Sequence, residues 1–257
     1  MITETSVQRL SHAASLLSHS AYTVAFTGAG ISTESGIPDF RSRESGLWDT
    51  VDPMQVASIY GFKSNPKAFY DWVKPLASLT LNAEPNPTHI ALAEMERCDQ
   101  LRAVITQNID NLHKRAGSRL VYELHGHMRR ATCIHCYHEV NAERRMEIFS
   151  ENGHVPRCEK CGGVLKPNII LFGEQLPIRT LLAAQDAARR ATVMLVIGSS
   201  LSVEPASELP LIAFRNGAKL IIINLEATPA DRYADVVLRG RAAEIMPEIV
   251  RRMEKSA

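Results

Sequence analysis

The segment TGAGISTESGIPDFR (residues 27–41) decides the fold of this chain. It follows YTVAF (residues 22–26), a short β-branched and aromatic run that is typical of a buried parallel strand. Two glycines separated by one residue then let the backbone approach a phosphate at a helix N-terminus. The dinucleotide fingerprint has a third glycine where this chain has Thr33, and Pro38 breaks any long helix, so only the beginning resembles a dehydrogenase turn. The segment therefore predicts a nucleotide-binding turn in an α/β protein.

The composition indicates a globular protein. The chain has 257 residues, of which 45% are hydrophobic, enough for one large domain or two unequal ones. A net charge of +1 gives no indication of the strongly basic surface that binds nucleic acid or an anionic membrane. Residues 1–20 have the spacing of an amphipathic helix, unlike a signal peptide, and no apolar run approaches the roughly 20 residues that span a bilayer. We therefore expect a soluble cytoplasmic protein without a nucleic-acid or membrane partner, and a monomer is compatible with the sequence.

Short apolar runs alternate with helical patterns along the chain. Strands are expected at residues 103–106, 121–125, 168–172, 193–197 and 220–224, and helices at residues 66–79, 89–98, 178–190, 207–216 and 241–254. This alternation predicts a doubly wound, mostly parallel sheet. Residues 126–166 break the pattern because they contain four cysteines and scattered charges, so we interpret them as an inserted module.

Four cysteines of this module predict a structural zinc site. They form two pairs, Cys133-x-x-Cys136 and Cys158-x-x-Cys161. Two such pairs match closed tetrahedral zinc coordination, the alternative being two redox pairs. His135 and His138 could compete as ligands, although surface positions are expected for both. Because four thiolates leave no open position for water, the metal should hold the module together without doing chemistry. The fifth cysteine, Cys98, is expected to be a small buried apolar residue.

Polar residues follow several of the predicted strands. These are TQNID (residues 106–110), His125, GSS (residues 198–200) and NLE (residues 224–226). Open α/β sheets bind ligands at the carboxyl ends of their strands, so these residues are candidates for one site. His125 is the best general-base candidate because a histidine pKa lies near neutrality. Alternatively, Asn108 and Asp110 cap a helix over residues 112–116, and the serine and glutamate segments are ordinary turns.

Together these motifs resemble the sirtuin family. In the family's order they are GAGIS (28–32), GIPDFR (36–41), TQNID (106–110), ELHG (123–126), the four cysteines, PNI (167–169), FGE (172–174), GSS (198–200) and NLE (224–226). The resemblance extends from about Ala21 to the C-terminus. It implies a Rossmann-like NAD-binding domain over residues 1–40, 88–126 and 167–257. Residues 41–87 would form the cofactor loop and the helical part of a smaller domain, and residues 127–166 its zinc-ribbon module.

The resemblance also implies roles for individual residues. His125 would be the general base, and Asn108 would share in catalysis. NAD would contact Gly28, Ala29, Gly30, Thr33, Asp39, Phe40, Arg41, Gln107, Asn108, Ile109, Asp110, His125, Gly198, Ser199, Ser200, Asn224, Leu225, Glu226, Arg241 and Ala242. Phe40 and Arg41 would close over its nicotinamide end. The peptide substrate would contact Ile170, Phe172, Gly173, Leu201 and Val203, and one zinc ion would be bound by Cys133, Cys136, Cys158 and Cys161.

The implied activity is NAD-dependent removal of acetyl or other acyl groups from protein lysines. In such enzymes the acyl oxygen attacks the nicotinamide ribose and nicotinamide leaves. The base then activates a ribose hydroxyl, giving free lysine and an O-acyl-ADP-ribose. Acetylated-lysine proteins or peptides would be the partners. Members that prefer acidic acyl groups carry a Tyr-x-x-Arg pair, whereas here Tyr70 is followed by Val73, which favours acetyl.

Other functions use parts of the same sequence. A desuccinylase or a mono-ADP-ribosyltransferase would share the NAD site. The glycine turn alone would permit a dehydrogenase, but Thr33 and the zinc module argue against it. A non-catalytic zinc protein that senses NAD or binds nucleic acid is the last alternative, and the low net charge gives nucleic-acid binding little support.

Overall fold

Six parallel strands form the large sheet of the protein. The computed structural model describes residues 4–39 and 51–254. The strand order is β3-β2-β1-β7-β8-β9. The strands are β1 (Thr23–Thr27), β2 (Ala103–Thr106), β3 (Val121–Glu123), β7 (Val193–Ile197), β8 (Lys219–Asn224) and β9 (Val236–Arg239). The order reverses at β1, whose neighbours are β2 and β7, so a crevice opens between the carboxyl ends of β1 and β7.

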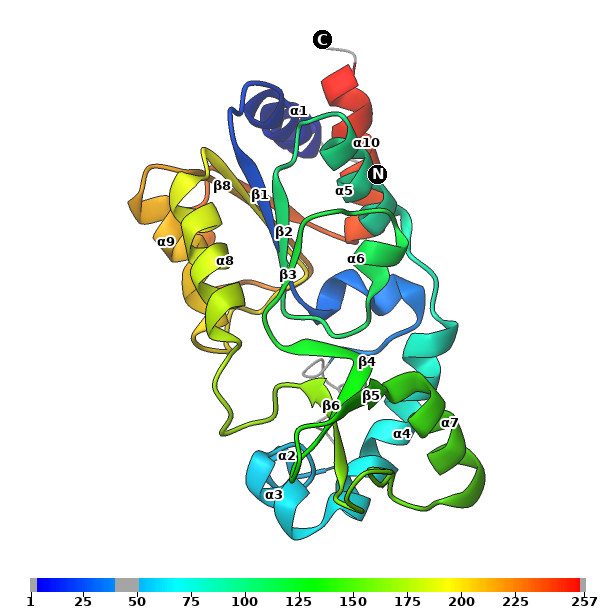
Figure 1. Cartoon of the computed structure of the whole chain (residues 1–257). Helices are drawn as coiled ribbons and strands as arrows, with labels where there is room; N and C mark the ends of the chain where they lie inside the picture. The colour runs from blue at the N-terminus through cyan, green and yellow to red at the C-terminus, as the bar shows by residue number, and fades with distance from the viewer. Residues whose placement is uncertain (1–3, 40–50, 255–257) are drawn as a thin grey trace.

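Helices cover both faces of this sheet (Figure 1). One face carries α1 (Glu4–Ser18), α5 (Pro87–Arg97) and α10 (Ala242–Glu254), and the other carries α8 (Ile178–Arg190) and α9 (Leu209–Arg215). Successive strand residues point to opposite faces, so Leu195 packs under the first layer and Met194 under the second. All five residues of β1 and of β7 are buried, as expected for strands covered on both sides.

A smaller domain lies at the carboxyl edge of the large sheet (Figure 1). Its antiparallel sheet has the order β5-β4-β6, with β4 (Gly126–Cys133), β5 (Glu139–Asn141) and β6 (Leu165–Ile169). Its helices are α2 (Pro53–Val56), α3 (Ile59–Ser64), α4 (Pro66–Asn82) and α7 (Ala142–Asn152). Phe62, Phe69, Tyr70 and Phe149 form its aromatic core, with ring centroids 5.1 to 6.3 Å apart. Only Leu124 and His125 connect β3 of the large sheet to β4 of the small one.

The expected fold class is confirmed, and two local predictions are wrong. Residues 168–172 do not add a strand to the parallel sheet, because β6 ends at Ile169 and pairs antiparallel with β4. Cys98 is exposed, since it follows the last residue of α5 and points away from the core. Among the helices of residues 4–39 and 51–254, none has both the length and the apolar character that crossing a membrane requires.

Candidate functional site

The glycine turn after β1 packs directly against the turn after β7. The Gly28 amide donates to the Ile197 oxygen at 3.1 Å, and the Gly30 amide donates to the Gly198 oxygen at 2.9 Å. A Cβ atom at Gly28 or Gly30 would lie 2.8 or 2.9 Å from that same Gly198 oxygen. Gly198 has a φ of +61°, and a Cβ there would lie 2.2 Å from the Ile31 nitrogen. The two turns therefore form a cradle with no side chains between them, which fits a dinucleotide pyrophosphate.

A cavity of about 1240 Å³ extends from this cradle along the carboxyl ends of the strands to the small domain. Most of the residues expected to bind NAD or peptide line it. They are Gly28, Ala29, Gly30, Thr33, Asp39, Gln107, Asn108, Ile109, His125, Ile170, Phe172, Gly173, Gly198, Ser199, Ser200, Val203, Asn224, Leu225, Glu226, Arg241 and Ala242. Phe40 and Arg41 lie outside the described residues. Segments far apart in the sequence thus meet around one cavity.

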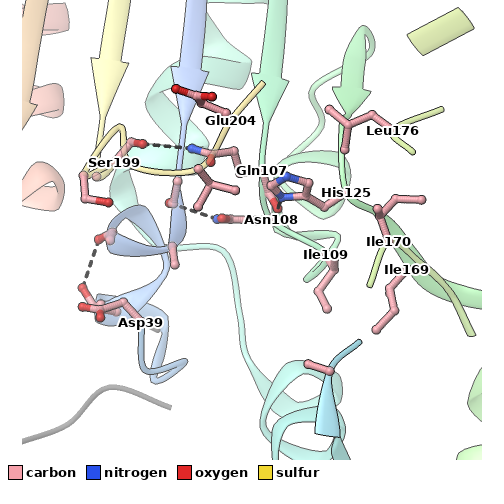
Figure 2. A pocket seen from close by; sticks show the side chains of 18 of the residues that line it. Asp39, Gln107, Asn108, Ile109, His125, Ile169, Ile170, Leu176, Ser199 and Glu204 are labelled. Atoms are coloured by element: carbon pink, nitrogen blue, oxygen red, sulfur yellow. Dashed lines mark hydrogen bonds between the residues drawn. The ribbon is translucent and has the colours of Figure 1, made fainter. Parts of the chain in front are cut away.

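His125 faces this cavity from the link between the two sheets (Figure 2). Its Nδ1 lies 2.9 Å from the Gln107 backbone oxygen. A carbonyl only accepts, so Nδ1 carries the hydrogen and Nε2 of the neutral ring is left as the proton acceptor. Burial lowers the pKa of His125, while the bond to Gln107 opposes that change. The imidazole is therefore held neutral and ready to accept a proton.

The Asn108 side chain is held by a buried polar network. Its Nδ2 donates to the Gly28 oxygen and to Ser32 Oγ, both at 3.1 Å. Ser32 Oγ in turn donates to the Asp110 carboxylate at 2.6 Å, and the other Asp110 oxygen accepts from the Leu112 amide at 2.9 Å. Asp110 therefore lies behind the cavity wall and supports Asn108 through Ser32. Its carboxylate also binds the first amide of α6 (Leu112–Arg115). Burial raises the pKa of Asp110, with the Ser32 hydrogen bond opposing it.

Gln107 connects the loop after β2 to the loop after β7. Its Nε2 donates to Ser199 Oγ at 2.9 Å (Figure 2), and Ser199 Oγ accepts from the Leu201 amide at 3.3 Å. Leu201 has a φ of +54° and is buried in the second face of the large sheet. It lies outside the cavity wall, whereas the neighbouring Val203 is part of it. The Leu201 side chain therefore lies away from the cavity, and the expected peptide contact of this residue stays a prediction for its backbone.

One end of the cavity is apolar and is formed mainly by the small domain. Val73 and Leu76 of α4, together with Ala57, Ile109 and Ile169, line this end. Tyr70 instead turns into the aromatic core, where its hydroxyl donates to the Leu165 oxygen at 2.7 Å and burial raises its pKa. Lys74, the residue after Val73, points away and donates to the Ser150 oxygen.

Several wall residues were not expected from the sequence. They are Glu34, Ala57, Trp72, Leu76, Ile169, Leu171, Glu174, Gln175, Leu176, Ile178, Leu181, Glu204, Pro205, Ile223 and Gly240. Most are apolar and belong to helix or strand patterns that the hydrophobic core explains equally well. Glu34 could have been predicted as a wall residue, because it lies inside the glycine segment (residues 27–41). Its carboxylate is 3.8 Å from Arg241 Nε, across the far end of the cavity.

The four expected cysteines converge at the tip of the small sheet. Their Sγ atoms all lie within 4.8 Å of one another, with 3.4 Å between Cys133 and Cys161 and 3.6 Å between Cys136 and Cys158. Four thiolates at this spacing fit a tetrahedral zinc ion. In the described part of the chain, this cysteine group is the cluster suited to hold a metal ion. His135 and His138 are outside it, so the surface interpretation of these histidines agrees with the structure.

Comparisons with known proteins give the family. The profile of the Sir2 family matches residues 28–205. The NAD-dependent protein deacylase 2 of Archaeoglobus fulgidus is 51% identical over 244 residues, which cover 95% of each chain. A Sir2 enzyme of known structure is 49% identical, with a TM-score of 0.92 over 97% of this chain and 99% of its own. A Sir2 structure with a p53 peptide and NAD+ is 42% identical, with a TM-score of 0.85 over 94% of this chain and 96% of its own. The sirtuin resemblance is thereby confirmed, and the chain belongs to the Sir2 family.

Proposed function

We propose that this protein is an NAD-dependent protein-lysine deacylase that removes acetyl groups, with His125 as the general base. One observation carries the proposal: the fixed imidazole of His125 faces the same cavity as the glycine cradle and the apolar end. The cavity then offers neighbouring positions for a dinucleotide, a proton acceptor and a lysine acyl group. The similar A. fulgidus protein, described as an NAD-dependent protein deacylase, supports this assignment.

NAD would bind along the carboxyl ends of the strands. Gly28, Gly30 and Gly198 would hold its pyrophosphate, and Asn224 with Glu226 at the end of β8 would meet ribose hydroxyls. Phe40 and Arg41 are proposed to cover its nicotinamide end. NAD supplies the cleavable bond between nicotinamide and ribose. Asn108 would orient the departing end, and His125 would accept a proton from a ribose hydroxyl at Nε2.

The acyl-lysine would enter toward the apolar end of the cavity. The backbone of Phe172 is already paired on one side, because its amide donates to the Ala57 oxygen and its oxygen accepts from the Ile59 amide. An extended peptide would lie between residues 170–173 and residues 201–203, with strand-like pairing to the backbone of both segments. In this arrangement Leu201 would contribute its backbone, and Val203 its side chain.

An uncharged acyl group fits this end better than a succinyl group. Among residues 4–39 and 51–254, Arg241 is the one arginine or lysine of the cavity wall, and it lies at the opposite end beside Glu34. A succinyl carboxylate near Val73 and Leu76 would be desolvated without a lysine or arginine partner from these described residues. Desuccinylation and mono-ADP-ribosyl transfer stay as alternatives on the same site, and a dehydrogenase or a non-catalytic zinc protein has less support.

Mass spectrometry of the products tests the proposal. The protein is incubated with NAD and matched acetyl-, propionyl- and succinyl-lysine peptides, with the His125→Ala variant alongside. We expect free lysine, nicotinamide and O-acetyl-ADP-ribose from the acetyl peptide, and little product from the succinyl peptide. Nicotinamide release without peptide, or ADP-ribose attached to protein, would contradict deacylation. Turnover unchanged in His125→Ala would contradict the assigned base.

The remaining assignments are also proposals. A cytoplasmic location and the lack of a nucleic-acid or membrane partner rest on composition and charge, and a monomer is compatible with the sequence. The division of the chain rests on the position of the zinc module: residues 1–40, 88–126 and 167–257 for NAD binding, 41–87 for the loop and helices, and 127–166 for the ribbon. Because β6 pairs with β4, we place the end of the small sheet at Ile169.

A further inference from the structure

Arg129 connects the two sheets across the link that carries His125. It lies on β4, three residues after Gly126, and reaches back to Glu123 at the end of β3. The pairing is bidentate, with Nη1 to Oε1 at 2.7 Å and Nη2 to Oε2 at 2.6 Å. Glu123 is only 11% exposed, and Lys114 donates to it as well. Burial would raise the pKa of Glu123, but the hydrogen bonds from Arg129 and Lys114 hold it below its ordinary value.

Arg129 also holds the loop that carries Asn108. Its Nη1 donates to Asn111 Oδ1 at 2.7 Å. Asn111 has a φ of +65°, in the left-handed region that residues other than glycine adopt at a cost. Because its oxygen is engaged by Arg129, Asn111 does not use its side chain to cap α6. Arg129 therefore compensates a strained backbone position one residue after Asp110.

Hydrogen bonds continue from this loop to the cavity wall. Asp110 accepts from Ser32 Oγ, and Asn108 Nδ2 donates to that same Ser32 Oγ. A second cavity of about 170 Å³ lies behind the loop and is lined by Ile109, Asp110 and Asn111 as well as by Arg129. On this side the hydrogen bonds of Arg129 therefore add to the packing of Ile109 against the core of the small domain in fixing the loop position.

We propose that Arg129 is a positioning residue that holds the His125 link and the 108–111 loop in one fixed arrangement. The inference rests on the proposed function, since it assumes that Asn108 and His125 act together on one bound NAD. Arg129 itself lies outside the wall of the large cavity. Its guanidinium contacts both Glu123 at the end of β3 and Asn111 of the loop, so its loss should loosen a connection that is otherwise supported by the bond between His125 Nδ1 and the Gln107 oxygen.

The neighbouring residue provides a matched control. Arg130 is on the same strand and also pairs with a glutamate, Glu139, at 2.7 Å, but both side chains are about half exposed on the zinc-ribbon sheet. We compare Arg129→Met, Arg129→Lys and Arg130→Met with the unmodified protein. Zinc content and melting temperature report the fold of each variant, and amide hydrogen exchange of residues 107–112 reports the loop without NAD.

Arg129→Met should speed exchange over residues 107–112 and lower kcat about tenfold to a hundredfold, since a displacement of about 1 Å can have that effect. KM for NAD should change less than kcat, because the glycine cradle that would hold the pyrophosphate is untouched. Arg129→Lys should act in the same direction, since it cannot make the bidentate pair. Arg130→Met should match the unmodified protein in both measurements. Exchange and kcat of both Arg129 variants equal to those of Arg130→Met would overturn the inference. An unmodified protein without deacylase activity would instead refute the proposed function, and the exchange data would still test Arg129.

Discussion

The Nδ1 atom of His125 lies 2.9 Å from the backbone oxygen of Gln107, so the main chain after β2 sets the tautomer of a side chain placed after β3. The same Gln107 reaches Ser199 with its own side chain. Neighbouring strand ends therefore fix one another, and the imidazole requires no carboxylate partner to orient it. Chemistry at His125 should depend on its Nε2 and on its low pKa.

Replacing His125 by Ala should lower deacylation about 10²- to 10⁴-fold, the usual contribution of a general base. Burial lowers the pKa of His125 below the ordinary value of 6.5, so the neutral base persists to lower pH. The acidic limb of the kcat/KM profile should therefore fall below pH 6.5. His127→Ala is the control, since His127 lies outside the cavity wall. An acidic limb above pH 6.5 would contradict the low pKa.

Gly198→Ala should abolish measurable NAD binding. The added Cβ would lie 2.2 Å from the Ile31 nitrogen and would push apart the two turns of the cradle. Calorimetric titration with NAD checks this. Gly217→Ala is the control, because Gly217 also has a positive φ, +94°, but open space around it. That control should lose only about 1–2 kcal/mol of stability and keep its NAD affinity.

Replacing Cys133 or Cys161 by Ser should remove bound zinc and destabilise the small domain. Three thiolates hold the ion less well than four, and metal binding contributes directly to folding. Metal analysis should give one zinc per unmodified chain and much less in either variant, with a lower melting temperature. Cys98→Ser, at an exposed cysteine of the large domain, should keep both values. Full zinc content in Cys133→Ser would show that the ligand assignment is wrong.

Acid should destabilise the protein through a buried histidine pair. His89 and His113 meet edge to face with ring centroids 4.8 Å apart, and burial lowers the pKa of His89 from 6.5 to about 4. Its Nδ1 accepts from the Asn86 amide, which requires an unprotonated nitrogen there. The unfolded chain binds the proton first, so this stabilisation is complete above pH 6.5 and is lost toward about pH 4.

The loss attributable to His89 should be about 3 kcal/mol in the free energy of unfolding. Denaturant titrations of the unmodified protein and of His89→Gln between pH 4 and pH 7.5 measure it. The variant should have a shallower dependence on pH than the unmodified protein. Equal slopes in the protein and its His89 variant would show that His89 titrates normally.

The parallel sheet could be predicted because its central strands are short apolar runs that stand out from their surroundings. The predicted bounds of the β7 strand, 193–197, agree with the structure. The β9 strand (Val236–Arg239) was missed because it follows a 3-10 helix at Asp231–Tyr233, so no α-helical pattern separates it from β8. The α7 helix was missed because charged residues are frequent in Ala142–Asn152, and only Ala142, Met146 and Phe149 are buried.

The part of the candidate site that is formed by polar residues directly after strands could be predicted. Its apolar end could be predicted only at Val73, which the family resemblance connects with acyl preference. Leu76 has the same helical spacing as core residues of α4, and only the tertiary fold shows that it faces a cavity. The sequence also does not show whether a side chain points into the cavity or away from it. Asp110 and Leu201 belong to predicted motifs, yet both turn behind the wall to support the residues in front of them.

The contact between the turns after β1 and β7 has a consequence for the growing chain. Most of the polypeptide separates Gly30 from Gly198, and β1 cannot gain its second neighbour until residues 193–197 have left the ribosome. Long-range parallel pairing of this kind forms slowly. The nucleotide cradle therefore does not exist for most of synthesis, and NAD can stabilise only a nearly finished protein, after the metal-binding ribbon has had time to fold around its ion.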